Sequence, residues 1–230
     1  SNGGEAQYIY GSEKMKLIFG AGYYKADVDE TFDFAFIIFD PAGDIILADP
    51  TIDSSATQKH KNAYLYSYFN LPGNVVLTIG ASGDFYNSTR IDKNQFNPKF
   101  GITWNPAPNT TLRAAAFRVM KRTLVTNQTL EPTQVAGFNQ FYDDTPGAES
   151  WRYGIGADQK FSQNVYGGAE YSIRELDVPV IDRNNNTVKS VDWDERMGRA
   201  YMYYTPHKWV AMKAEYIYEQ CKRSNDYHKG

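Results

Sequence analysis

Hydrophobic and polar residues alternate with a period of two along most of the chain. From 75 to 86, one set of alternate positions is mainly apolar and the other is mainly small or polar. The same pattern recurs at 96–105, 151–161, 165–174 and 210–219, and more weakly at 15–25, 62–71 and 198–204. Side chains of a β-strand point alternately to its two faces, so each segment is predicted to be a strand with one apolar face. A helical repeat would mix the two classes on every face. Segment 112–122 loses phase near Ala115, which predicts a β-bulge.

The connections between these strands alternate in length. Short turns are predicted at 11–14, 71–74, 105–109, 162–164 and 205–208. Long links are predicted at roughly 27–60, 87–95, 123–150 and 180–191. Long loops at one edge and short turns at the other are typical of outer-membrane barrels, whose tilted strands of about 9–11 residues cross the hydrocarbon layer. The predicted fold class is therefore all-β: an antiparallel up-and-down transmembrane β-barrel of about ten strands.

The alternation also predicts which face meets lipid. Large aromatic residues lie on the apolar phase near strand ends, where the interfacial girdles of barrels occur (Phe69, Trp104, Trp151, Phe161 and Tyr204). The opposite phase carries charges of both signs, which suits a hydrated lumen. The predicted lumen-lining residues are Lys99, Arg113, Arg152, Asp158, Lys160, Glu170, Arg174, Lys213 and Glu215. Because their signs are mixed, we expect ladders of ion pairs that brace the wall rather than a ring that selects one sign.

A soluble β-protein also alternates, so one alternative stays open: a lipocalin-like barrel that encloses the apolar phase and binds an apolar small molecule. It requires Ile79, Ile102, Ile155 and Ile173 to meet in one enclosed centre.

Glycines recur on the polar phase of the predicted strands (Gly20, Gly22, Gly80, Gly101, Gly154, Gly156 and Gly168). Glycine permits both bending of a strand and close approach of another backbone. Curvature of the wall is the simpler interpretation. A surface against which an internal plug packs is the other.

Composition narrows the function classes. The 230 residues carry a net charge of −3 and a pI of about 5.7, so no basic field indicates a nucleic-acid partner. A single cysteine, Cys221, excludes an internal disulfide. No stretch approaches the roughly 20 apolar residues of a membrane-spanning helix. The chain opens without Met and closes on a polar run. We therefore expect one barrel segment over 1–230, incomplete at both ends and part of a larger barrel.

The residues resemble a known family. The run 96–104, the turn Asn105-Pro106 and the following strand with Arg113 resemble strands of TonB-dependent-receptor-like outer-membrane barrels. Thr129-Leu130-Glu131-Pro132 is similar to that family's Leu-Lys-Pro-Glu element, with Glu131 where Lys is commoner, and 151–156 is similar to the strand start that follows. The resemblance covers about 62–218. Segment 130–140 is also similar to barrels that follow tetratricopeptide repeats in Gram-negative proteins.

This resemblance implies a barrel in the outer membrane of a Gram-negative bacterium, with outer-membrane lipid as a partner. It also implies an upstream plug or tetratricopeptide-repeat domain of the same chain, and passage or uptake of a solute. The sequence shows no plug-like domain ahead of the barrel and no TonB box. Uptake and export therefore both stay open.

Motifs for catalysis or metal binding are weak. Three scattered histidines (His60, His207 and His228) and one cysteine make no zinc set. A calcium-like loop begins at Asp182, but Thr187 replaces its obligatory glycine and Trp193 its final Glu. We predict no enzyme, no metal and no cofactor. An outer-membrane enzyme stays a third alternative, with acid/base candidates Asp192, Asp194 and Glu195. Asp143 and Asp144 are interpreted as loop-hydrating acids.

The link 27–60 contains an apolar run, 32–39, then the turn 41–44 and a second apolar run, 45–47. We predict an inserted hairpin in this long loop, which would act as a gate or as a flap that contacts ligand.

Overall fold

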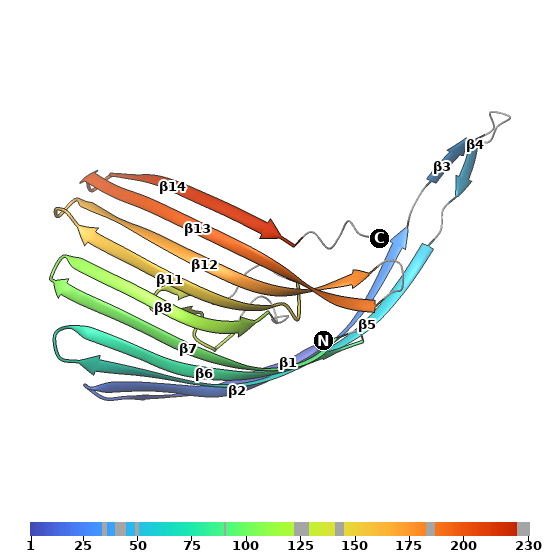
Figure 1. The fold of residues 1–230 in the computed structure, drawn as a ribbon, viewed down its shortest axis with the longest axis horizontal. Coiled ribbons are helices and arrows are strands. Elements are labelled where there is room, and N and C mark those ends of the chain that lie inside the picture. Colours follow the sequence, from blue (N-terminus) through green and yellow to red (C-terminus); the bar gives the residue numbers. More distant parts are fainter. Residues whose placement is uncertain are drawn as a thin grey trace.

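The computed structural model describes residues 1–33, 36–39, 45–48, 51–89, 91–121, 129–140, 145–182 and 187–224. Its main element is one ten-stranded sheet in the order β1-β2-β5-β6-β7-β8-β11-β12-β13-β14, in which every neighbouring pair is antiparallel. Figure 1 shows this sheet as a curved wall with β1 and β14 at its two edges. The all-β class and the strand number are as predicted. No helix within the described ranges is long and apolar enough to cross a membrane.

The ten strands of the wall are β1 (Asn2–Gly11), β2 (Met15–Asp33), β5 (Thr51–Leu71), β6 (Val75–Ser88), β7 (Asp92–Ala107), β8 (Thr110–Met120), β11 (Glu149–Lys160), β12 (Val165–Asp182), β13 (Thr187–His207) and β14 (Val210–Arg223). Two small hairpins lie outside it: β3 (Phe36–Phe39) with β4 (Ile45–Ala48), and β9 (Gln134–Val135) with β10 (Phe138–Asn139). The first projects beyond the wall (Figure 1). It falls in the link where a hairpin was expected, although its turn, residues 40–44, lies outside the described residues.

The short turns lie where the sequence places them. The turn between β5 and β6 uses Gly73 and Asn74 at φ values of 80° and 60°, a region that glycine and asparagine tolerate best. The long links differ from expectation. Only residues 89–91 join β6 to β7, and only 183–186 join β12 to β13. The strands continue instead: β5 and β13 each contain 21 residues. The outer part of β5 is mainly polar, and that of β13 has only isolated apolar residues such as Val191 and Trp193, so the alternation was too weak to mark these ends.

The predicted bulge near Ala115 is wrong. Strand β8 pairs with β11 without interruption from Thr110 to Met120. The apparent loss of phase has another cause. Phe117 and Val119 point to the same face as Arg113, and they are 0% and 8% exposed because a chain segment covers them there.

The two faces of the wall differ as the alternation predicts. On one face Ile79, Ile102 and Ile155 are 42%, 42% and 64% exposed. They are not enclosed in a centre, so the structure does not support the lipocalin-like alternative. The other face carries a hydrophobic cluster that includes Tyr66, Phe117, Val135 and Phe138. The segment that supplies Val135 and Phe138 leads to the candidate site.

Candidate functional site

The connection from β8 to β11 folds back over the polar face of the wall. We call its residues 129–140 the strap. Strap residue Asn139 accepts a hydrogen bond from Arg152 on β11 through its carbonyl, at 3.1 Å, and the adjacent Gln140 donates to Tyr66 on β5, at 2.9 Å. Strands β5 and β11 are four steps apart, or about 19 Å along the sheet. Because adjacent strap residues reach both, the strap lies on the concave face of the curved wall.

The first edge strand holds the beginning of the strap. The Glu5 carboxylate on β1 accepts hydrogen bonds from the backbone N–H groups of Leu130 and Glu131, at 2.8 and 3.1 Å, and from the Thr129 hydroxyl at 3.0 Å. Gln7, also on β1, donates to the Leu130 carbonyl. Hydrogen bonds to a charged acceptor are among the stronger ones in proteins. The strap therefore ties β1 to the middle of the sheet.

A carboxylate is buried where the strap crosses β5. Glu131 is 4% exposed, and it accepts hydrogen bonds from the Tyr66 hydroxyl at 2.8 Å and from the Asn62 amide at 3.3 Å. Gln140 links this group to the backbone of the strap, because its amide donates to the Pro132 carbonyl at 2.6 Å as well as to Tyr66. A buried polar group is tolerated when it is hydrogen-bonded, so this cluster fixes where the strap lies.

Two apolar strap residues sit in sockets formed by glycine. Gly101 on β7, Ala115 on β8 and Gly154 on β11 form one cross-strand row of small residues. A Cβ at Gly101 would lie 2.9 Å from Val135, and one at Gly154 would lie 2.6 Å from the Phe138 ring. The plug-surface interpretation of the polar-phase glycines therefore holds at these two positions, and the segment that packs there belongs to this chain.

Two arginines hold the Phe138 ring. The guanidinium carbons of Arg113 and Arg152 lie 5.2 and 5.6 Å from the ring centroid, within cation–π range. Both side chains also donate to strap carbonyls: Arg113 to Ala136 at 3.4 Å, and Arg152 to Asn139. These two arginines therefore fix the strap in place by contacts with both the Phe138 ring and the strap backbone.

A two-residue turn joins the two strap strands, with positive φ at both positions: 46° at Ala136 and 84° at Gly137. Positive φ at both central residues is the type I′ geometry that fits a tight hairpin. A Cβ at Gly137 would also lie 2.4 Å from a terminal nitrogen of the Arg113 guanidinium, so a larger residue here would displace that side chain.

A ladder of ion pairs crosses five strands beside the strap. Arg113 on β8 bonds Asp158 on β11 at 2.8 Å and Glu170 on β12 at 3.2 Å. Arg199 on β13 bonds Glu170 at 3.5 Å and Glu215 on β14 at 2.5 Å, and Lys213 bonds Glu215 at 2.6 Å. The three positively charged and three negatively charged side chains leave this set without a net charge. We call this set the ion ladder. It has the form that the mixed signs predicted.

The nine predicted polar residues all point to the strap's side of the wall, but they are not one group. Arg113, Asp158, Glu170, Lys213 and Glu215 belong to the ion ladder. Arg152 holds the strap, and Arg174 pairs separately with Glu195 at 2.7 Å. Lys99 is 1% exposed and donates to the Arg118 carbonyl at 3.1 Å. Lys160 is exposed at the end of β11.

A second buried polar group lies on β5, β6 and β7, and the sequence did not single it out. His60 Nε2 lies 2.9 Å from the Asp84 carboxylate, and each side chain is 5% exposed. The Asn97 amide donates to Asp84 at 2.6 Å. A small cavity of about 10 Å³, room for at most one water, lies between this group and Glu131. Polar residues at alternate positions of three paired strands were the available signal.

The acid/base candidates are not gathered together. Asp192 and Asp194 are exposed on one face of β13, whereas Glu195 points to the other face and bonds Arg174. Strand geometry separates neighbouring side chains in this way. Asp143, Asp144 and His228 lie outside the described residues, as do residues 183–186 of the calcium-like loop. Among the described residues, no group of three His, Cys, Asp or Glu side chains is placed to hold a metal ion.

Comparisons with known proteins agree with this geometry. The family model described as "TonB dependent receptor-like, beta-barrel" matches residues 2–156. No curated protein matches the chain. Among solved structures, the FrpB iron transporter of Neisseria meningitidis (F3-3 variant) has a TM-score of 0.66 at 12% identity, covering 95% of this chain and 35% of its own.

Two further structures are similar. The siderophore receptor PiuA of Acinetobacter baumannii has a TM-score of 0.63 at 13% identity, with 94% of this chain and 37% of that chain covered. The alcaligin outer-membrane receptor FauA of Bordetella pertussis has a TM-score of 0.54 at 13% identity, with 95% and 42% covered. This chain therefore spans well under half the length of these relatives. Taken together, the family model and the fold show that the chain belongs to the TonB-dependent receptor-like β-barrels, which lie in the outer membrane of Gram-negative bacteria.

Proposed function

We propose that this chain forms part of the wall of a barrel through which a solute crosses the outer membrane. The observation that carries the proposal is the contrast between the two faces. The outer face exposes large apolar residues such as Ile155, while the concave face carries the ion ladder. A polar interior within an apolar band is the arrangement that transmembrane barrels use for an aqueous passage.

In this proposal, Lys99, Arg113, Arg152, Asp158, Lys160, Glu170, Arg174, Lys213 and Glu215 line the lumen side, and the strap narrows it. The strap buries Val135 and Phe138 against the wall and leaves Thr133, Gln134 and Asn139 exposed. The Gln134 amide donates to the Asn139 side chain at 2.8 Å. A passing solute would therefore meet uncharged hydroxyl and carboxamide groups at the narrow point. The ion ladder would act mainly as a brace.

The rest of the barrel would be supplied from outside these residues. The described sheet has two edges, β1 and β14, and the chain covers 35% of the FrpB structure. We infer that further strands close the barrel and that a plug or tetratricopeptide-repeat domain precedes it in the same protein. The hairpin in the link 27–60 would lie on the long-loop side as a gate. We also propose that the chain carries out no catalysis.

The solute class follows from the relatives. FrpB is described as an iron transporter, PiuA as a siderophore receptor and FauA as an alcaligin receptor. Ferric siderophores are therefore the candidate solutes, and uncharged sugars, which need no specific binding site, report how wide the passage is. Lipopolysaccharide-free proteoliposomes containing the full-length protein allow a direct test by solute flux.

The experiment compares the wild-type protein with a variant in which residues 129–140 are replaced by a Gly-Ser linker of equal length. We expect uncharged sugars to enter proteoliposomes faster through the linker variant, because the strap no longer narrows the lumen. A matched control replaces the turn 162–164 with Gly-Ser and is expected to leave the flux unchanged. Any plug domain that precedes the barrel is deleted from both proteins, so that only the strap narrows the lumen. If sugars then enter no faster with the linker variant than with empty liposomes, the passage proposal is wrong.

A further inference from the structure

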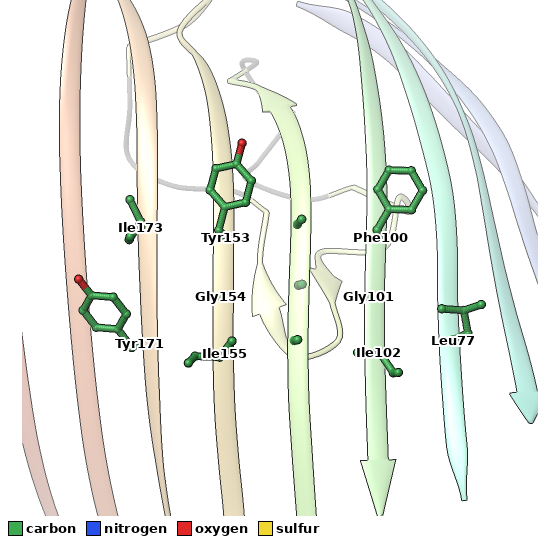
Figure 2. A pocket seen from close by; sticks show the side chains of 12 residues that line it. Leu77, Phe100, Gly101, Ile102, Tyr153, Gly154, Ile155, Tyr171 and Ile173 are labelled. Carbon is green, nitrogen blue, oxygen red and sulfur yellow. The ribbon is translucent and has the colours of Figure 1, made fainter. Parts of the chain in front are cut away.

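The part of the concave face that the strap does not cover carries three aromatic residues. Figure 2 shows Tyr153 and Tyr171 on the outer face, where aromatic residues of a barrel are expected to meet lipid. Tyr166, Tyr201 and Tyr203 point to the opposite face, beside the ion ladder. Because that face is the lumen side of the wall, contact with lipid does not explain these three rings.

The three lumen-facing rings form one group, which we call the tyrosine cluster. Tyr166 on β12 pairs directly with Tyr203 on β13, and Tyr201 is two residues away on the same face of β13. The ring centroids are 5.9, 6.2 and 6.4 Å apart, within the range of favourable aromatic contacts. The cluster lies toward the end of the wall that carries the short turns, on the left in Figure 1.

A glycine allows one ring of the tyrosine cluster to be held in place. Gly168 on β12 pairs with Tyr201 on β13 and with Asp158 on β11. Because Gly168 has no side chain, the Tyr201 hydroxyl reaches across it and donates to the Asp158 carboxylate. A Cβ at Gly168 would lie 2.7 Å from that hydroxyl and 2.6 Å from the carboxylate oxygen. The Tyr201 ring is therefore fixed before a ligand arrives, as binding sites require.

Cations already lie over two of the three rings. The Arg199 guanidinium carbon is 4.8 Å from the Tyr201 centroid, and Lys213 Nζ is 5.9 Å from the Tyr203 centroid. In the part of the chain that the structure describes, no cation lies over the Tyr166 ring. Tyr166 is 40% exposed, so its ring is the one available for stacking.

A lysine beside the tyrosine cluster gives this part of the face a positive charge. Lys160 on β11 pairs directly with Tyr166, one strand away or about 4.8 Å along the sheet, and it is exposed. The adjacent ion ladder has no net charge, and Lys160 forms no ion pair with any described residue. An available ring face next to one uncompensated positive charge complements a planar ring that carries one negative charge.

We propose that the tyrosine cluster is a binding site for an aryl carboxylate, a planar aromatic ring that carries one carboxylate group. The ring stacks on Tyr166, and the carboxylate accepts a hydrogen bond from Lys160. The rings of Tyr201 and Tyr203, inclined by 38° and 36° to that of Tyr166, border the site. This inference rests on the proposed passage, because the ligand reaches the cluster through the lumen.

The test measures binding of salicylate to the full-length protein in detergent by ligand-observed NMR titration. We expect Tyr166→Leu to weaken binding about fivefold, because one ring–ring contact is lost. Lys160→Met should weaken it about threefold, as expected for an exposed charge contact. The matched control Tyr171→Leu changes the outer face of the same strand, at 39% exposure, and should leave the affinity unchanged. Lys208→Met, in the turn after β13, controls for general attraction of anions.

Two further ligands separate the contribution of the ring from that of the charge. Salicylamide keeps the aromatic ring without the carboxylate, and cyclohexanecarboxylate keeps the carboxylate without the aromatic ring. Each is expected to bind at least threefold more weakly than salicylate. Equal binding of cyclohexanecarboxylate and salicylate would overturn the proposal, because the tyrosine rings would then contribute nothing specific.

Two results with the variants would also overturn it. One is an equal loss of affinity with Tyr171→Leu, which would indicate binding to the detergent-covered face. The other is unchanged affinity in Lys160→Met, an exposed change that keeps the test decisive if Tyr166→Leu does not fold. Sugar flux does not depend on Tyr166, so loss of salicylate binding with flux retained would contradict only this inference. Salicylate binding without flux would contradict only the proposed passage.

Discussion

The strands from β5 to β11 and the two strands β13 and β14 belong to one sheet, yet their concave faces differ. On β7, Asn97 and Lys99 are 0% and 1% exposed. On β14, every residue except Gln220 is classed as exposed, including Lys213 and Glu215. The strap covers the first region and does not reach the second, in which β14 is also an edge strand of the described sheet. The comparison teaches that alternation determines which way a side chain points, whereas a distant segment determines whether that side chain is buried.

The largest effect is expected where the strap is anchored. Phe138→Ala removes a ring that is 2% exposed and is held by Arg113 and Arg152. We expect the free energy of unfolding of the full-length protein, measured by guanidinium titration in detergent, to fall by about 3–5 kcal/mol. Tyr203→Ala, an aromatic residue on the uncovered concave face, should cost about 1 kcal/mol. Equal losses would contradict the contrast between the two regions.

The ion ladder provides a second test, because it runs from the covered region to the open one. Arg113 has a 13% exposed side chain and faces two carboxylates and a strap carbonyl. Arg113→Met is expected to destabilise by about 3 kcal/mol, since it leaves Asp158 and Glu170 buried without this cation. Lys213→Met, at the exposed end of the same ladder, should give no measurable change. A larger loss at Lys213 than at Arg113 would show that the edge strand, not the strap, depends on the ladder.

A smaller effect is expected from adding one methyl group. Gly154→Ala places a Cβ 2.6–2.9 Å from the Phe138 ring and should destabilise by about 1–3 kcal/mol, because the ring must move from its socket. Gly198→Ala is the matched control on β13, where the nearest atoms are 3.8 Å away. It should unfold like the wild type in the same titration. If Gly154→Ala is equally neutral, the strap does not pack against the row of small residues.

The sequence predicted the wall well because one local rule generates it. Ile102 and Ile155 follow the apolar phase, and Arg113 and Asp158 follow the polar phase, so their faces could be assigned without knowledge of the fold. Strand lengths were less predictable. The outer parts of β5 and β13 are mainly polar and make side-chain contacts such as Thr57 with Asp27 and Ser190 with Asp177, so no regular apolar pattern marks their pairing.

The strap was the main feature that the sequence did not predict. Its position depends on contacts between Glu5 and Leu130 and between Tyr66 and Gln140, which no local period records. Two signals were present but misassigned: Phe117 and Val119 in the polar phase, interpreted as a bulge, and the glycines at 101 and 154, interpreted first as curvature. Both signals arise because the strap packs on the concave face of the wall.

The hydrogen bonds from Leu130 and Glu131 to Glu5 close a loop of about 125 residues. Contacts so distant in sequence are slow to form, because the intervening chain must be ordered before they stabilise anything. We therefore expect the first strand to dock early through its pairing with the second, and to become locked only after most of the sheet has been assembled. The Glu5 carboxylate on the first strand of the sheet thus acts late in folding, although it precedes its strap partners in the chain by about 125 residues.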